Sequence, residues 1–372
     1  MKIGLICPYD IFKNGGVQEC VLALRSEYEH SGHTAFIITP RPKGIQADLA
    51  DEGILLVGQS RDFKSPFHTT AQVSVTFDNT SLEELLANHN FDILHFHEPW
   101  VPIISRQIAS RSTAVNIGTF HAKLPDTMMS RTIEKVITPY TKSILKYVDV
   151  YTAVSDAAAE YIESLTDQRI NIIANGIDIN KFKPSRKTKR KLNSILYIGR
   201  LEKRKGVKYL LDAFYELQKT DNQVELIIAG DGPDREKLEN YVSDYGILNV
   251  KFLGYIDEHA KIELLQETTL YCSPAVYGES FGIVLLEAMA SQAVTVAGAN
   301  PGYSSVLKDK GAVSLVNVKD TPEFTRRLKI MLTDKDIRNL WTRWAKSYVK
   351  DFSYEKIAKQ YLDLYKSALK NK

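Results

Sequence analysis

The chain has 372 residues, of which 44% are hydrophobic and 25% charged, and its formal net charge is +3. This composition is typical of a folded globular protein, and the length favours two domains over one. The small net charge gives no support to nucleic acid as a partner, and three scattered cysteines favour reduced thiols over a disulfide framework. We find no signal sequence and no membrane-spanning apolar run, which predicts a cytoplasmic protein; peripheral attachment to the inner face of the cell membrane stays open.

The first half alternates short apolar runs with helical patterns, which predicts a parallel sheet. Strands are expected at residues 2–7, 34–39, 92–98, 115–121 and 150–154. After the first of them, Asn14-Gly15-Gly16-Val17 precedes a helical pattern that stops at Gly32. Strand, glycine turn and helix is a geometry that lets backbone amides approach a phosphate, so Gly15 and Gly16 are candidate binding residues. A plain tight turn is the alternative.

Histidines mark the ends of two predicted strands. His95 and His97 share one strand face and Glu98 follows them, but without a further ligand cluster we predict no metal site. His121 ends the next strand. In open α/β sheets ligands collect at the carboxyl ends of strands, so His121 is predicted to contact substrate. A hydrogen-bonded structural histidine is the alternative.

A basic run with a proline, residues 181–191, interrupts the alternation of apolar runs and helical patterns. It predicts a linker between domains at 1–180 and 192–352. A solvated hinge is the expected role of this run, and contact with anionic lipid is the alternative. Strands resume at residues 194–199, 224–229, 250–253, 269–273 and 293–297. The amphipathic tail, residues 353–372, is expected to form a helix that packs back on the first domain. The prediction is an α/β protein with two doubly wound, Rossmann-like domains facing across a cleft.

Two motifs in the second half indicate an anionic ligand. Arg200 and Lys205 follow a strand and could stabilise a diphosphate, although a solvated basic turn is the alternative. In the stretch 277–290 a glycine-containing loop becomes an apolar helix, with Glu279 at the helix mouth and Glu287 inside it. We expect Phe281-Gly282 in the first helical turn, where free amides face an anion. Carboxylates beside a phosphate site predict a nucleotide that bears a sugar.

Competing motifs are missing or incomplete. The chain has no phosphate-binding G-x-x-x-x-G-K-[ST] motif, and Gly230-Asp231-Gly232 lacks the third glycine of the dinucleotide fingerprint. Asp334-Lys335-Asp336 lies on a polar stretch and is expected to cap a helix rather than to bind a metal. No Ser/His/Asp or Cys/His set indicates an enzyme that uses a catalytic nucleophile.

Taken together, Gly15-Gly16-Val17, Gly199-Arg200 with Lys205-Gly206, and Glu279-x7-Glu287 resemble the retaining glycosyltransferases of family four over almost the whole chain. Within that family the sequence motifs are most similar to those of the phosphatidylinositol mannosyltransferases, as at His95-Phe96-His97-Glu98-Pro99 and Thr119-Phe120-His121.

The resemblance implies the GT-B fold and a nucleotide-sugar donor, most readily GDP-mannose, with no metal or other cofactor. It implies that Arg200 and Lys205 hold the diphosphate with Gly16, and that His121 and Glu279 face the sugar; these four side chains, Arg200, Lys205, His121 and Glu279, are the expected catalytic set. The remaining implied contacts are Glu287 to the ribose, Ile256 to the base, and the loop and helix start at Ser280, Phe281, Gly282 and Ile283 to the sugar or phosphate.

The expected acceptor is a lipid-linked or glycan molecule such as phosphatidylinositol. The resemblance is weakest here, because residues 69–90 contain Glu83 and Glu84 but none of the basic residues of the mannosyltransferases' membrane helix. Lys123, Arg131 and Lys135 could replace part of that charge. Alternatives are a transferase that uses UDP-glucose or another nucleotide sugar, a nucleotide-sugar 2-epimerase on the same fold, and a non-catalytic binding protein.

Overall fold

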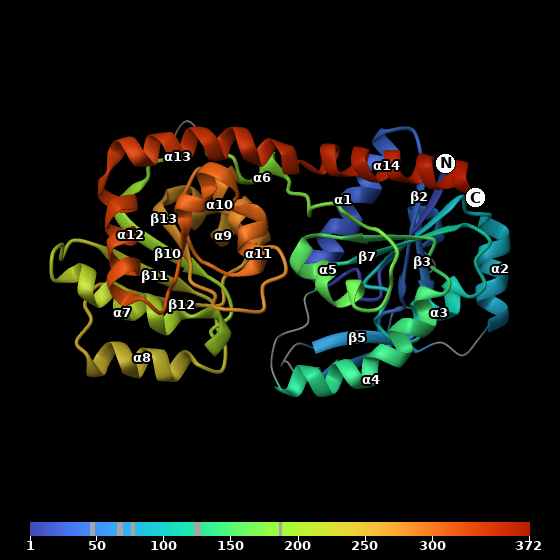
Figure 1. Ribbon diagram of the computed structural model, residues 1–372, viewed down its shortest axis with the longest axis horizontal. Helices are drawn as coiled ribbons and strands as arrows, with labels where there is room; N and C mark the ends of the chain where they lie inside the picture. The colour runs from blue at the N-terminus through green and yellow to red at the C-terminus, as the bar shows by residue number, and fades with distance from the viewer. Residues whose placement is uncertain (45–48, 65–69, 76–78, 123–127, 186–187) are drawn as a thin grey trace. The chain divides into compact units, whose positions relative to one another are not determined.

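The computed structural model describes residues 1–44, 49–64, 70–75, 79–122, 128–185 and 188–372. The chain forms two compact units (Figure 1): unit 1 is Met1–Gly176 with Tyr354–Lys372, and unit 2 is Ile177–Ser353. The run 181–191, predicted as a linker, lies inside unit 2. Its start belongs to helix α6 and its last residue begins strand β10.

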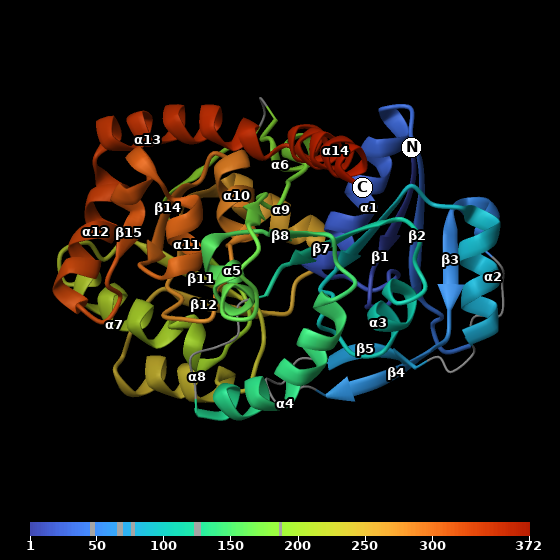
Figure 2. The same cartoon turned by 45° about the vertical axis from the view of Figure 1, so that its right-hand side comes forward.

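Unit 1 contains a parallel sheet whose order among the described residues is β3-β2-β1-β6-β7-β8-β9 (Figures 1 and 2). The order runs outward in both directions from the β1–β6 pair, which is therefore the topological switch point. The strands are β1 Lys2–Ile6, β2 Thr34–Pro40, β3 Ile54–Val57, β6 Ile93–His97, β7 Val115–Phe120, β8 Val150–Ala153 and β9 Ile170–Ile172, with an antiparallel hairpin β4 Gln59–Lys64 and β5 Thr70–Val75.

The two faces of this sheet bury alternate residues of each strand. In β1, Ile3 and Leu5 pack in one core cluster with α1 and α14, whereas Ile6 joins a second cluster on the opposite face. This two-sided burial explains why the strands read as continuous apolar runs. The helices of unit 1 are α1 Gly16–His30, α2 Asn79–His89, α3 Ile104–Ala109, α4 Met128–Leu145, α5 Asp156–Glu163 and α14 Tyr354–Asn371, with a 3-10 turn η1 at Ala50–Glu52.

The C-terminal helix α14 is held in unit 1 by an apolar stripe and by two tyrosines. Tyr361 and Tyr365 are buried in the cluster that contains α1. The Tyr365 hydroxyl lies 3.0 Å from the Tyr28 hydroxyl on α1 and 2.6 Å from Nδ1 of His95 on β6. These polar contacts tie α14 both to its neighbouring helix and to the sheet beneath.

Unit 2 contains a parallel sheet of order β12-β11-β10-β13-β14-β15 among the described residues. This is the doubly wound order, with its switch point between β10 and β13. The strands are β10 Lys191–Ile198, β11 Glu225–Ala229, β12 Val250–Gly254, β13 Thr268–Ser273, β14 Val294–Gly298 and β15 Leu315–Val316. β10 begins earlier than predicted because Lys191 pairs with Thr268.

Side-chain caps begin several helices of unit 2. Asp257 accepts from Ala260 N at the start of α9, and Asp334 accepts from Asp336 N and Ile337 N at the start of α13, as predicted for the Asp334–Asp336 motif. The helices are α6 Ile179–Phe182, α7 Val207–Gln218, α8 Arg235–Asp244, α9 Glu258–Glu267, α10 Ile283–Ala290, α11 Pro301–Val306, α12 Thr321–Thr333 and α13 Lys335–Tyr348, with 3-10 turns η2 Lys203–Lys205, η3 Asp309–Ser314 and η4 Val349–Phe352.

The predicted α/β fold class is confirmed, because each unit is a doubly wound domain built on a parallel sheet. Some strands were not predicted. The short strands β3 and β15 lie at the edges of the unit 1 and unit 2 sheets, and the β4–β5 hairpin forms its own two-stranded sheet.

Candidate functional site

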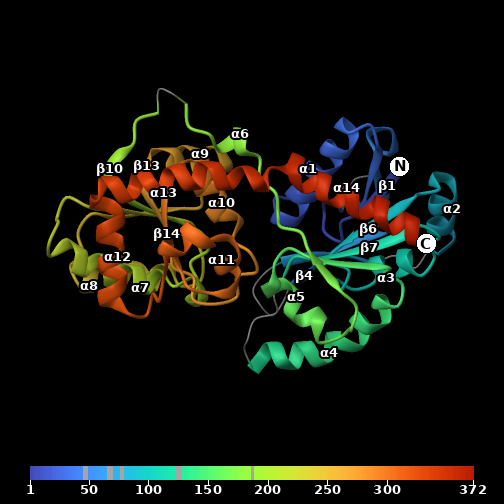
Figure 3. The same cartoon turned by 45° about the horizontal axis from the view of Figure 1, so that its top comes forward.

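The switch point of unit 2 brings two loops side by side. One follows β10 and contains the turn η2, and the other follows β13 and leads to α10 (Figure 3). Because β10 and β13 are hydrogen-bonded parallel neighbours, the loops that follow them emerge at the same edge of the sheet, where ligands bind in doubly wound domains.

A glycine allows the two loops to touch. Gly206 ends η2 with a left-handed φ of 71°, and a Cβ atom there would lie 2.1 Å from the carbonyl oxygen of Pro274. Next to this contact, Val276 N donates to the Arg204 carbonyl at 2.8 Å. A larger residue at Gly206 would therefore both strain the turn and push the second loop away.

The side chains on these loops form a charged cluster around Glu279. Lys205 Nζ donates to Glu279 Oε1 at 2.7 Å, and Arg204 Nη1 donates to the same oxygen at 2.9 Å. Arg204 also donates to the Gly278 carbonyl at 3.2 Å and pairs through Nε with Glu202 at 2.8 Å. Arg204 thus links three points: its own turn, the second loop and the carboxylate.

Partial burial makes these contacts stronger than ordinary surface ion pairs. The side chains of Glu279, Lys205 and Arg204 are 12%, 19% and 30% exposed. Charge-assisted hydrogen bonds at partly buried positions are stronger than exposed pairs, which contribute at most about 1 kcal/mol. The ammonium group of Lys205 is therefore held in place before any ligand arrives.

Arg200 lies at the start of the same loop but is less constrained. Its side chain is 37% exposed, and Nε lies 3.8 Å from Glu202 Oε2. Its carbonyl accepts from the buried Tyr197 hydroxyl at 2.9 Å, which fixes the backbone. The structure thus gives Arg200 a fixed base and an accessible guanidinium.

Helix α10 begins two residues later than the loop motif suggested. We predicted Phe281-Gly282 in its first turn, but the helix starts at Ile283, and that prediction is wrong. Gly282 is its N-cap with φ 106°, which a helical residue cannot adopt. Gly282 has no side chain with which to cap α10, and in the first turn the Leu285 amide donates to the Gly282 carbonyl at 2.9 Å. The Phe281 side chain is buried, so Phe281 can meet a ligand only through its backbone.

The second carboxylate lies deeper in unit 2. Glu287 is on α10 and is 6% exposed, and Lys261 on α9 donates to its Oε1 at 2.8 Å. This cation satisfies the requirement of a buried carboxylate for a partner. Ile256 is half-buried on the loop between β12 and α9. The structure therefore supplies two separate cation–carboxylate pairs, Lys205–Glu279 and Lys261–Glu287.

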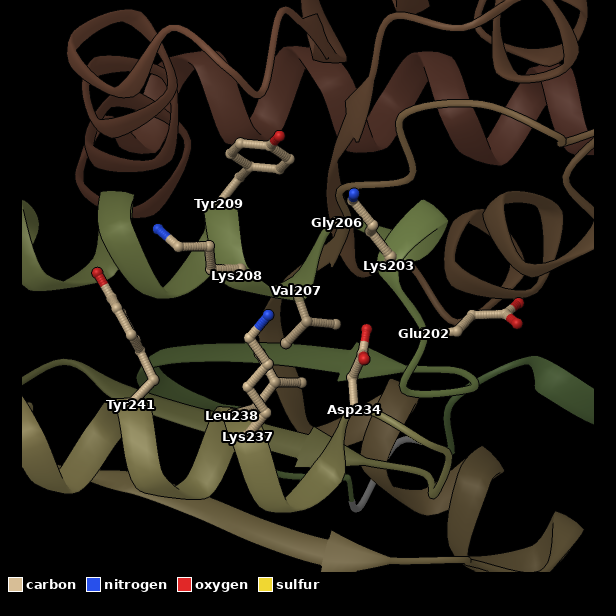
Figure 4. A pocket seen from close by; sticks show the side chains of 10 residues that line it. All are labelled: Glu202, Lys203, Gly206, Val207, Lys208, Tyr209, Asp234, Lys237, Leu238 and Tyr241. Atoms are coloured by element: carbon tan, nitrogen blue, oxygen red, sulfur yellow. The ribbon is translucent and has the colours of Figure 1, made fainter. Parts of the chain in front are cut away.

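A pocket of about 190 Å³ lies beside the charged loop, between the starts of α7 and α8. Figure 4 shows Asp234, the residue before α8, and Lys237 on α8 pointing toward Val207 at the start of α7. Lys203 lines this pocket, whereas Lys205 bonds to Glu279. Two lysines of one turn thus face different surroundings.

In unit 1 the corresponding switch point carries histidines instead of charges. Gly15 is the N-cap of α1, with extended backbone, and α1 begins at Gly16, so the predicted strand, glycine turn and helix are present. His97 at the end of β6 lies 2.9 Å from His121 Nε2 through its Nδ1, and His121 Nδ1 lies 3.2 Å from Asn175 Oδ1. Both ring nitrogens of His121 therefore have partners inside unit 1.

Burial keeps these histidines neutral. Desolvation lowers the pKa of His95 to about 3 and that of His121 to about 4, and it lowers the pKa of His97 well below its usual value. Burial also raises the pKa of Glu98 to about 7, against the opposing effect of the hydrogen bond from His121 N at 2.6 Å. This edge of unit 1 is thus a polar but weakly charged network.

One ring nitrogen of this network has no partner. His97 Nε2 is buried and bonds to no other described residue. Cys20, His97 and His121 each offer one ligand atom, and these atoms lie within 4.8 Å of one another. Burial raises the pKa of the Cys20 thiol to about 12, and the two histidines already bond to each other, so the cluster has the character of a neutral hydrogen-bonded core.

The structure brings Lys205 and Glu279 into direct contact and places Arg200 on the same loop, as a shared site requires. The sequence did not single out Arg204 and Lys261, whose side chains bond to the predicted site residues Glu279 and Glu287. Arg204 looked like any member of a basic run, and Lys261 lies in a helix without a motif. The spacing of Lys261 from the Asp257 cap is the only signal that could have placed it on the first turn of α9.

Two sequence observations about the acceptor lie partly outside the described residues. Lys123 is not described, and the side chains of Arg131 and Lys135 are likewise outside the described part. Residues 79–89 form α2. Among the described helices, none combines the length and apolarity that crossing a bilayer requires.

Comparison with known proteins gives a consistent assignment. Residues 14–181 match the family model described as Glycosyltransferase Family 4, and residues 178–348 match Glycosyl transferases group 1. The phosphatidyl-myo-inositol mannosyltransferase of Mycolicibacterium smegmatis is 28% identical, covering 99% of this chain and 94% of that protein. The protein of the same name from Propionibacterium freudenreichii is 30% identical, covering 83% and 80%.

Solved structures agree on the fold. A glycosyltransferase from Rickettsia africae has a TM-score of 0.76 at 18% identity, covering 100% of this chain and 99% of its own. A sucrose-phosphate synthase from Thermosynechococcus elongatus has a TM-score of 0.77 at 18% identity, covering 100% of both chains. Taken with the matched models and the full-length relatives, these similarities show that the chain belongs to the family-four glycosyltransferases.

Proposed function

We propose that this glycosyltransferase moves mannose from GDP-mannose to a lipid acceptor, with phosphatidylinositol the first candidate. The observation that carries the donor part is the Lys205–Glu279 pair at the switch point of unit 2. The lipid part is supported by relatives named phosphatidyl-myo-inositol mannosyltransferase that align with 99% of the chain.

In this proposal unit 2 binds the donor. Lys205 and Arg200 hold the diphosphate and stabilise the charge that develops on it as the glycosidic bond breaks. Lys205 and Arg204 both bond to Glu279 Oε1. The other carboxylate oxygen, Oε2, accepts a hydrogen bond from a sugar hydroxyl. The amides at Ser280, Gly282 and Ile283 meet the sugar or phosphate, Glu287 meets the ribose, and Ile256 lies against the base.

Unit 1 contributes neutral groups in the same proposal. Gly15 and Gly16 offer backbone amides to the diphosphate, and His121 faces the sugar. Because both His121 nitrogens are bonded to His97 and Asn175, one of these bonds must be exchanged for a bond to the sugar. The network that fixes His121 therefore also orients it.

The reaction we propose is retaining and independent of metal ions. The acceptor hydroxyl attacks the face of the sugar from which the nucleotide leaves, and the departing phosphate takes its proton. Arg200 and Lys205 supply the positive charge that a metal ion supplies in other transferases. No protein nucleophile is needed in this route.

The test is a turnover assay with purified protein, vesicles that contain phosphatidylinositol, and EDTA. GDP-mannose is compared with UDP-glucose, and both nucleotide release and a mannosylated lipid of retained configuration are measured. Transfer from GDP-mannose but not from UDP-glucose supports the proposal. Transfer from UDP-glucose overturns the donor, and loss of activity with EDTA overturns metal independence.

An assay with donor alone separates the transferase from an epimerase. A 2-epimerase would convert the nucleotide sugar without any acceptor, whereas a transferase shows at most slow hydrolysis. Formation of the C2 epimer of the donor sugar from the donor alone would contradict the transferase proposal.

A further inference from the structure

A second concave surface lies at the opposite end of the unit 2 sheet from the charged loop. A groove of about 750 Å³ is formed by the starts of β10, β13 and β14 together with helix α13, which runs past these strands in Figure 3. Because the proposed donor residues follow the carboxyl ends of β10 and β13, this groove is separate from them.

The lining of the groove is strongly basic. Four cationic side chains and a single carboxylate, Asp336, line it. Arg190 belongs to the basic run 181–191, for which contact with anionic lipid was the alternative to a hinge, and it donates to the carbonyl oxygens of Thr268 and Ser291. These bonds anchor the Arg190 guanidinium at the strand starts without neutralising it. The four cations are Arg190, Arg338, Arg343 and Lys346.

Helix α13 presents its basic groups on the side away from the core. Trp341 and Ala345 face inward and are buried, and Trp341 Nε1 donates to Ser314 Oγ at 2.7 Å. Leu340 and Arg343, three residues apart, and Lys346, a further three residues on, share the outward stripe, and all are exposed. The helix is therefore held by one face and offers the other.

Two large apolar side chains accompany this charge. Leu192 is 82% exposed and Leu340 is 60% exposed, and both line the groove. Exposure of such large apolar side chains to water is unfavourable, whereas the basic side chains beside them favour contact with water. This combination is typical of surfaces whose apolar side chains enter a bilayer while basic groups stay at the level of the phosphates.

We propose that this groove of unit 2 is a docking surface for an anionic phospholipid membrane. The proposal rests on the proposed function, because a lipid acceptor requires the enzyme to work at a bilayer. Basic charge and exposed leucine together favour a bilayer over a free phosphate, which would use the cations alone.

The experiment measures sedimentation of the full chain with vesicles of phosphatidylcholine, with and without phosphatidylglycerol. Phosphatidylglycerol supplies negative charge without being the proposed acceptor. The variant Arg343→Gln/Lys346→Gln is compared with Lys319→Gln/Lys329→Gln, which removes the same charge from exposed positions of unit 2 outside the groove. Thermal unfolding of each variant checks that the fold is intact.

We expect the groove variant to bind the anionic vesicles about 25-fold more weakly, about fivefold for each basic residue, and the control to bind like the wild type. Leu340→Ser, which keeps the charge, should lower binding about tenfold because an exposed leucine no longer enters the bilayer.

Equal binding by the groove variant and the control would overturn the proposal. So would loss of vesicle binding on addition of inorganic phosphate at constant ionic strength, which would identify a free anion as the ligand. Donor-dependent thermal stabilisation of these variants should stay unchanged, because none of these residues lies at the donor site. If lipid glycosylation fails while vesicle binding behaves as expected, the proposed function falls and the docking surface remains.

Discussion

The two units share one topology, yet their switch points are built from opposite chemistry. In unit 2 the loops after β10 and β13 carry charges, Lys205 and Arg204 against Glu279, at partly exposed positions. In unit 1 the ends of β6 and β7 carry His97 and His121, whose pKa values burial lowers so that they stay neutral. The same strand order thus presents an ionic edge in one unit and a neutral, hydrogen-bonded edge in the other.

The difference indicates which edge suits which part of the proposed substrate. A diphosphate needs fixed positive charge, and the carboxylate of Glu279 holds the Lys205 ammonium in place for the diphosphate that we propose binds there. Sugar hydroxyls need neutral donors and acceptors of fixed orientation, which the His97–His121–Asn175 chain supplies. The proposed division of labour follows from these two environments.

The largest effect is expected when a charge is removed from the ionic edge of unit 2. Lys205→Ala should lower kcat/KM about 10² to 10³-fold, because an electrostatic contact to the leaving phosphate is lost. Lys203→Ala in the same turn is the matched control, since Lys203 lines the neighbouring pocket and should change activity less than about twofold. Steady-state kinetics of both variants, at saturating acceptor, tests the assignment. Similar activities for the two variants would remove the role of Lys205.

Arg204 tests whether the ionic edge also needs positioning. Arg204→Ala should lower kcat/KM about 20-fold, because the loop at Gly278 and the Glu279 carboxylate lose a shared donor. The loss should appear in kcat with little change in nucleotide affinity, measured by titration calorimetry with GDP. Arg204→Lys should recover part of the rate, since it can bond Glu279 but not Glu279 and Gly278 together. A variant that loses affinity and rate equally would indicate a direct ligand contact instead.

The sequence predicted the elements well where local pattern decides them. The predicted strand 115–121 is confirmed to within one residue as β7 Val115–Phe120, and every residue of it is buried. The start of α10 was wrong because the left-handed Gly282 that ends the loop leaves no pattern in the sequence. Strand ends, caps and the doubly wound order followed from apolar runs and turn residues.

The site was predictable in its residue types but less so in its connections. Arg204 could not be told from its neighbours in a basic run, because only the approach of the Gly278 loop gives it a special partner. The two bonds of His121 depend on His97 and on Asn175, which lies 54 positions away in sequence. Contacts at such distance arise from topology, which local pattern does not encode.

A smaller effect is expected at the deeper carboxylate. Glu287→Gln should raise the Kd for GDP about fivefold and leave kcat nearly unchanged, because a ribose contact stabilises ground state and transition state alike. The exposed Glu263→Gln on α9 is the control and should leave the Kd unchanged. Titration with GDP and with guanine base separates the effects, since the base alone lacks the ribose. An equal loss for both ligands would place Glu287 elsewhere.

The smallest effect tests the neutral edge through stability. Below about pH 6.5, His95, His97 and His121 bind protons in the unfolded chain but stay neutral in the folded state, where burial lowers their pKa values. The free energy of unfolding therefore falls as the pH falls toward about 4. Glu98, with its pKa raised to about 7, opposes this between its ordinary value of 4.5 and 7, because the folded state keeps a proton that the unfolded chain has lost. Three histidines outweigh one carboxyl group, so the unfolding midpoint of unit 1 should drop by about 5 °C between pH 7 and pH 5.

His95→Gln should reduce this pH dependence by about half, since Glu98 already offsets about one of the three neutral histidines and a second is then gone, whereas His30→Gln on the exposed side of α1 should leave it unchanged. Scanning calorimetry at several pH values measures the slope for the wild type and both variants. Stability that is flat or rises on acidification would show that the histidines are charged in the folded state. In that case the contrast between an ionic edge in unit 2 and a neutral edge in unit 1 would be lost, and His121 would face the sugar as a cation.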